Sequence, residues 1–122
     1  MMTGREESRL EGEFLETALR RSEFLRRNEP KKANKEHDRL HRLKEKMRRL
    51  PDRGEGALKR AAAATEDPDA RILVAAALLA VDEAFATTLL EQIRIADVGL
   101  PSFTAEVTLK EWRAGAIRGY WS

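Results

Sequence analysis

The two histidines of the chain, His37 and His41, lie four residues apart, a spacing that places two imidazoles on one face of a helix. Helical zinc sites use this spacing, and the metalloprotease motif adds a glutamate directly after the first histidine. Asp38 stands in that position here, which shortens the base and changes its reach. Glu45 continues the row, but the chain has no cysteine and no third histidine to complete a ligand set. We therefore expect surface or boundary histidines, with no bound metal or other cofactor.

Other patterns that could support catalysis are weaker. The sequence contains no glycine-rich phosphate loop, no G-x-S-x-G elbow and no serine–histidine pair at motif spacing. Neighbouring carboxylates, such as Glu6 with Glu7 and Asp82 with Glu83, lie at expected helix starts, where they offset the helix dipole. The sequence therefore predicts a protein that is not an enzyme.

The strongest functional candidate is a row of cations on one flank of an expected helix. Such a row could follow phosphates or an acidic protein surface. Residues 20–49 contain thirteen Lys or Arg against five Asp or Glu, whereas residues 66–112 contain three against nine. The two halves could therefore also dock and shield each other, or the row could simply be solvated. The members of this basic row are Lys35, Arg39, Arg42, Lys46 and Arg49.

The nature of the partner is partly constrained by what surrounds the basic row. No aromatic residue is interleaved for base stacking, and the acidic Asp38 and Glu45 share the outer side. We therefore expect an unidentified protein partner, or self-association, ahead of the alternative of nucleic-acid binding. Further candidate contact residues lie near the C-terminal end: Trp112, Arg113, Tyr120 and Trp121. Of these, Trp112 also suits a position in the core.

Helices must position these candidates, and the sequence predicts helices throughout. It has no alternating apolar pattern and no Asn-Gly or Asp-Gly hairpin signal. Prolines mark boundaries, because the residue before a proline is disfavoured in a helix. The box Thr108-Leu109-Lys110-Glu111 predicts that a last helix begins at Thr108 and ends near Gly115. The other expected helices cover 6–27, 31–50, 54–65, a stretch that starts at 68, a stretch capped by Asp82, and a short turn after Pro101.

Apolar spacing predicts the core side of three helices. The first helix should use one line with two flanking leucines, interrupted by Arg21. The second should present a narrow stripe, and the fifth a three-residue line with two neighbours. The expected core residues are Leu10, Phe14, Ala18 and Leu25 with Leu15 and Leu19; Leu40, Leu43, Met47 and Leu50; and Phe85, Leu89 and Ile93 with Ala86 and Leu90.

Residues 72–81 form an uninterrupted apolar run inside a chain that is 36% charged. A membrane span needs about 20 apolar residues, so this run is too short, and charged residues flank it on both sides. Its bulky residues fall on several sides of a helical wheel, so neighbours must cover it all round. We expect it to be the central helix, with Asp67 as its N-cap and Pro68 in its first turn.

Length and composition predict one domain of 122 residues without disulfides, as suits a reducing cytoplasm. The first residues carry charges of both signs and no apolar segment typical of a secretory signal. We expect a cytoplasmic protein with no membrane association. Within it we expect an N-terminal helical arm over residues 1–29, a core over 30–115 and a tail over 116–122.

The D-P-D-x-R turn before an apolar helix resembles the turns of HEAT and armadillo-like repeats. Over residues 31–115, the segments KKANKEHDRLHRL, EDPDARILVAAALLAVDEAFATTLLEQI and FTAEVTLKEWRAG resemble a bacterial family of small HEAT-like domains of unknown function. The resemblance implies an all-α, right-handed, HEAT/armadillo-like array of about five to six antiparallel helices. It also implies that Arg71 pairs with an acidic neighbour. Ala70 departs from the usual valine, and no activity is implied.

Overall fold

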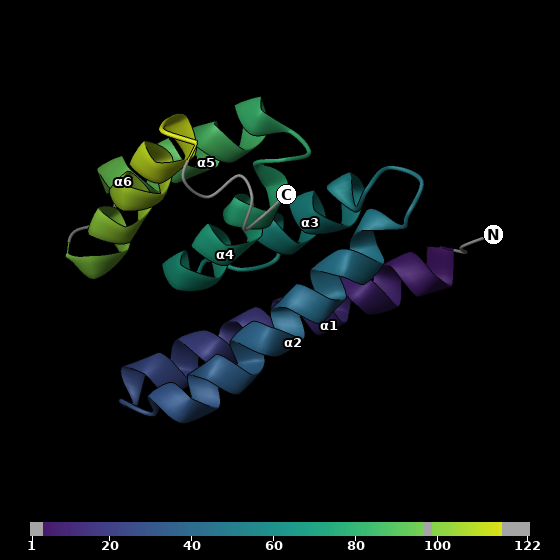
Figure 1. The fold of residues 1–122 in the computed structure, drawn as a ribbon, viewed down its shortest axis with the longest axis horizontal. Helices are drawn as coiled ribbons and strands as arrows, with labels where there is room; N and C mark the ends of the chain where they lie inside the picture. Colours follow the sequence, from purple (N-terminus) through teal and green to yellow (C-terminus); the bar gives the residue numbers. More distant parts are fainter. Residues whose placement is uncertain (1–3, 97–98, 116–122) are drawn as a thin grey trace.

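The computed structural model describes residues 4–96 and 99–115, and all regular structure in these residues is α-helical. Figure 1 shows the helices packed in consecutive pairs, α1 with α2, α3 with α4, and α5 with α6. The expected all-α class is therefore confirmed. Over the described ranges the helices are α1 (Gly4–Arg26), α2 (Pro30–Arg48), α3 (Glu55–Ala63), α4 (Pro68–Leu78), α5 (Glu83–Ala96) and α6 (Leu100–Arg113).

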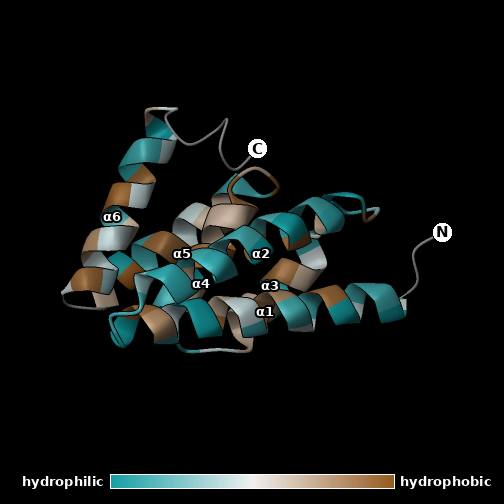
Figure 2. Cartoon of the chain, turned by 60° about the horizontal axis from the view of Figure 1, so that its bottom comes forward, coloured by the Kyte–Doolittle hydropathy of each residue, from teal (hydrophilic) through white to brown (hydrophobic). Residues whose placement is uncertain are grey.

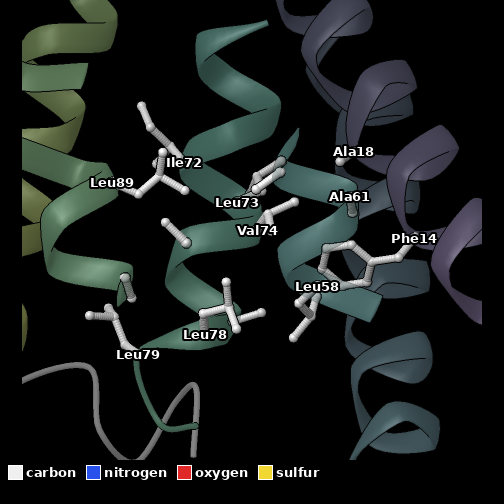
Figure 3. Close-up of a cluster of buried hydrophobic side chains, with 14 of the residues drawn as sticks. Phe14, Ala18, Leu58, Ala61, Ile72, Leu73, Val74, Leu78, Leu79 and Leu89 are labelled. Carbon is white, nitrogen blue, oxygen red and sulfur yellow. The ribbon is translucent and has the colours of Figure 1, made fainter. Parts of the chain in front are cut away.

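The helix α4 is central, as its apolar run predicts. Every residue from Ile72 to Leu79 is buried, and α4 packs against α1, α3, α5 and α6. In Figure 3, Ile72 and Leu79 lie on the side of α4 that faces Leu89 of α5. Val74 lies on the other side, toward Phe14 of α1. No helix in the described part of the chain is long and apolar enough to cross a membrane.

Side-chain caps start α4 and α5 at the predicted residues. The Asp67 carboxylate accepts a hydrogen bond from the Ala70 N–H at 2.9 Å, and Pro68 occupies the first turn of α4. The Asp82 carboxylate accepts from the Phe85 N–H at 3.1 Å. These oxygens satisfy N–H groups that lack partners at the start of a helix.

The helix α1 packs against α2, α3 and α4, and part of its predicted core line is wrong. Leu10, Phe14 and Ala18 are buried as expected, but Leu25 is 47% exposed and Leu19 is 36% exposed. A helix contributes to the core only where neighbouring helices lie over it, and sequence spacing does not reveal where that cover ends.

Two small polar residues of α1 are also buried, although the apolar spacing did not predict core positions there. Thr17 and Ser22 are buried, and their hydroxyls donate to the carbonyls of Glu13 at 2.7 Å and Ala18 at 3.1 Å. Because these hydrogen bonds stay within the helix, the hydroxyls are satisfied without water. The buried face therefore includes positions that an apolar count does not detect.

The helix α2 buries Leu40, Leu43 and Met47 of the predicted stripe, and Leu50, just after the helix, is buried as well. After it, Gly54 has φ +85°, and a Cβ added there would lie 2.9 Å from the Met47 Cβ. Asp52 closes this turn by accepting from the N–H groups of Gly54 at 3.0 Å and Gly56 at 2.9 Å. The hydrogen bond from Gly56 is the main cause that lowers the pKa of the Asp52 carboxyl. Glycine at 54 thus permits the close approach of α2 and α3.

The fifth-helix prediction is correct except at its first aromatic residue. Leu89 and Ile93 are buried together with Ala86 and Leu90, but Phe85 is 38% exposed. The Lys59 ammonium lies 4.9 Å from the centre of the Phe85 ring. Phe85 therefore faces a partly open surface beside α3 rather than the core.

The predicted start of the last helix at Thr108 is wrong. The helix α6 is continuous from Leu100 to Arg113, with Gly99 before it and Pro101 in its first turn. The Thr108 hydroxyl donates to the Thr104 carbonyl at 2.8 Å, which is a bond inside a helix and not a cap. The predicted end is confirmed, because Gly115 has φ +80° and its N–H donates to the Trp112 carbonyl.

Candidate functional site

The basic row lies on an exposed flank of α2, beside the Leu40–Met47 stripe that faces α1. Four members belong to α2, and Arg49 occupies its C-cap position. Long stretches of α2 are coloured hydrophilic in Figure 2. The structure therefore brings all five members to one helix face, and all are exposed: Lys35, Arg39, Arg42, Lys46 and Arg49.

The members of the basic row form no ion pair and no side-chain hydrogen bond within residues 4–96 and 99–115. Arginines on other surfaces behave differently. Arg20 binds Glu36 at 3.2 Å, and Arg60 binds Glu11 at 2.6 Å and Glu7 at 3.0 Å. The acidic second half does not neutralise the row by contact in the described residues.

His37 and His41 are half-buried and touch each other, with their Nε2 atoms 3.1 Å apart. Burial lowers the pKa of His37, and the nearby positive groups of His41 and Arg21 lower it further. Burial is also the main cause that lowers the pKa of His41, followed by the charge of Lys44. No cluster of three or more His, Cys, Asp or Glu side chains suited to a metal occurs in the described residues.

Lys44 is a residue that the sequence pattern did not single out. It is only 5% exposed, on the same side of α2 as the two histidines. Burial lowers its pKa to about 8, and the charge of Arg48 contributes to the shift. The signal in the sequence was its position directly after Leu43, at the edge of the core stripe.

Trp112 is 7% exposed and belongs to the core, and its indole N–H donates to the Glu83 carboxylate. Glu83, which lies at the start of α5, therefore also accepts a hydrogen bond from the core tryptophan. Arg113 is exposed and binds Glu91 at 3.3 Å. The remaining candidates of this group, Tyr120 and Trp121, lie outside the described residues.

The acidic turn before α4 has a different basic partner from the one that the HEAT resemblance implies. Arg26 of α1 pairs with Asp67 and lies 3.8 Å from Asp69. Arg71 has no ion pair among the described residues, and its Nε is buried without a hydrogen-bond partner there. The expectation that Arg71 pairs with an acidic neighbour is therefore wrong for this part of the chain.

A hollow of about 280 Å³ lies between α1, α4 and α6. Ile72, Leu73 and Ala76 supply its apolar side, Leu25 borders it from α1, and Leu100 borders it from α6. This hollow explains the exposure of Leu25, because nothing in the described chain fills the space beside it.

Comparison with known proteins gives no relative from which a role could be transferred. No family model, no curated protein and no solved structure matches this chain.

Proposed function

We propose that this chain is a short HEAT-like array that acts as a non-catalytic protein-interaction module, binding an acidic protein surface through the basic row. The observation that carries the proposal is that five exposed cations share one face of α2 without an ion pair in the described residues. Cations on the other helices commonly have acidic partners. The packing of the helices in consecutive pairs supports a repeat-like array.

The dimensions of the row suit an extended contact. From Lys35 to Arg49 the helix rises about 21 Å, at about 1.5 Å per residue. Each exposed ion pair contributes about 0–1 kcal/mol, so the row would add orientation and association rate more than affinity. Arginine can hold a carboxylate through two parallel N–H bonds, which makes the contact directional.

Acidic residues on α2 favour a protein partner over a phosphate backbone. Asp38 and Glu45 are exposed on the helix that carries the basic row. They would repel a continuous line of phosphates, whereas an acidic protein surface can place its own cations or neutral groups opposite them. Nucleic-acid binding through the same row is the second candidate function.

The experiment compares three full-length baits in pull-downs from cell extract. The row variant changes Arg39, Arg42 and Lys46 to glutamine. The control variant changes the exposed, ion-paired Arg9, Arg27 and Lys110 to glutamine, which removes the same net charge from other parts of the chain. We expect the row variant to lose, at low salt, proteins that wild type and control both retain. This difference should shrink as salt rises, because salt screens the contacts that the row makes in the wild type. Identical sets for all three baits would refute a role for the row.

A DNA titration separates the second candidate. We expect no measurable binding to a duplex at about 150 mM salt. Contact with about five phosphates would give a slope near −4.5 for log affinity against log salt, and the row variant would lower its magnitude by about three. Micromolar binding with that behaviour would replace the protein-binding proposal by a nucleic-acid one.

A further inference from the structure

A cleft of about 170 Å³ lies where α3, α4 and α5 meet, on elements separate from the basic row. Two residues that departed from their sequence-based predictions both line it: Arg71, which was expected to pair with an acid, and Phe85, which was expected in the core. The other polar and apolar side chains at its wall include Lys59, Thr88, Leu89 and Gln92. A cleft lined by an arginine without a partner is a candidate binding site.

The guanidinium of Arg71 is the main feature of this cleft. Its residue is half-buried, its Nε is shielded from solvent, and no described residue accepts a hydrogen bond from it. Because Nε has almost no accessible surface, only the two terminal nitrogens of this guanidinium can hold a ligand in the cleft. Ala62 and Ala63, at the C-terminal end of α3, also line the cleft, and the dipole of that helix end favours a cation. The dipole helps to hold the charge there, but it supplies no carboxylate for the terminal nitrogens.

The charge inside the cleft indicates a singly charged anion. Lys59 binds Asp82 at 2.7 Å and lies 3.8 Å from Glu55, so acidic side chains already offset its ammonium. One guanidinium then remains without a counter-charge in the described residues. A carboxylate carries one negative charge and accepts two parallel N–H bonds from arginine.

The other residues that line the cleft indicate that the ligand has a small, mainly apolar body. Phe85 is 38% exposed, and the Lys59 ammonium lies 4.9 Å from the centre of its ring. With Leu89 and the two alanines it offers apolar contact, and Thr88 and Gln92 offer a hydroxyl and an amide. The volume of about 170 Å³ lies below the roughly 300–1,000 Å³ of pockets for drug-sized molecules. Only a small acid or a single side chain fits.

We propose that the cleft between α3, α4 and α5 binds a small carboxylate with an apolar body, which Arg71 holds through its guanidinium and Phe85 contacts with its ring. The carboxylate can belong to a free acid or to an acidic side chain of another protein. The proposal stands independently of the function assigned to the basic row, because the two sites share no residue.

The test is an NMR titration of the full chain, which follows the Arg71 Nε–H and the Thr88 amide. Sodium benzoate is the probe, and benzamide is the neutral analogue of nearly the same shape. We expect benzoate to shift both signals with saturation, and benzamide to bind at least about tenfold more weakly because it lacks the charge. Equal binding of benzoate and benzamide would overturn the proposal.

Variants then assign the effect to this cleft. Arg71→Gln should weaken benzoate binding at least about tenfold, whereas Arg94→Gln, on the same helix as Phe85 but paired with Glu91, should leave it unchanged. Phe85→Leu keeps an apolar residue and removes the ring, and should weaken binding several-fold even if Arg71→Gln fails to fold. Unchanged benzoate binding in Arg71→Gln would refute the assignment of the ligand to this cleft. If Arg71→Gln does not fold, unchanged binding in Phe85→Leu would refute it.

Two further probes separate the sources of the ligand and the two sites of the molecule. Tighter binding of N-acetylglutamate amide than of benzoate would indicate a protein side chain, and the reverse would indicate a free acid. Tighter binding of phenyl phosphate than of either acid would overturn the carboxylate assignment. The glutamine variant of the basic row should bind benzoate like wild type; a loss there would place the binding on α2 and refute the cleft.

Discussion

Replacing Leu78 by alanine tests the central position of α4 directly. Leu78 has no exposed surface, and four other helices cover α4. Alanine removes three carbon atoms, which costs about 2.4 kcal/mol in lost burial at about 0.8 kcal/mol for each CH₂. Helices on all sides restrict collapse, so the cavity adds to this loss, and we expect a total of about 3–4 kcal/mol. Urea unfolding followed by circular dichroism would measure it, and the melting temperature should fall by about 12–16 °C.

Leu25→Ala is the matched control, because it makes the same chemical change in α1. Leu25 is 47% exposed and borders the hollow, so we expect a loss of only about 1 kcal/mol. The sequence pattern placed both leucines in the core and predicts similar losses. Equal losses at the two positions, or a loss below about 1 kcal/mol for Leu78→Ala, would refute the arrangement around α4.

Three further predictions concern pH, metal and backbone. The fold lowers the pKa of Lys44 from 10.5 to about 8, so the unfolded chain binds more protons than the folded chain between these pH values. The free energy of unfolding should therefore rise from about pH 8 to pH 10.5. Urea titrations at several pH values would measure this rise, and Lys44→Met should remove it. Purified protein should carry no stoichiometric zinc by metal analysis, and near-equimolar zinc that disappears when His37 and His41 are both changed to alanine would contradict this. Gly54→Ala should destabilise the fold by about 2 kcal/mol or more, because φ is +85° there and the new Cβ would lie 2.9 Å from a side-chain carbon of α2. Gly12→Ala should instead stabilise the fold by about 0.5–1 kcal/mol, because Gly12 lies in α1 with open space around it. Thermal unfolding of both glycine variants measures this contrast.

Local signals in the sequence were sufficient to predict most helix boundaries. Pro30 and Pro68 begin their helices, and Asp67 and Asp82 cap theirs, because these effects depend only on the nearest residues. The central place of α4 was also predictable, since a helix that is apolar on all sides must be covered on all sides. The box at Thr108 failed because Gly99 and Pro101 had already started the helix upstream.

Features that depend on distant segments were not predictable from spacing. The exposure of Phe85 and Leu25 depends on which other helices lie beside them. The acidic partner expected for Arg71 is absent among the described residues. Asp67 pairs instead with Arg26, which lies forty-one positions earlier in the chain. The basic row was visible in the sequence, but the absence of ion pairs to its members in the described residues emerged only once the helices were placed.

The encirclement of α4 has a consequence for the order in which the chain assembles. Phe14 and Val74 belong to one buried cluster although sixty positions separate them in the chain. The α1–α2 and α5–α6 hairpins join helices that are adjacent in sequence, so they can form early. The side of α4 that faces α1 is covered only after a long loop has closed. Until then the most apolar of the described helices stays exposed to other chains. The interval before α1 reaches α4 is therefore when this protein is most prone to aggregate.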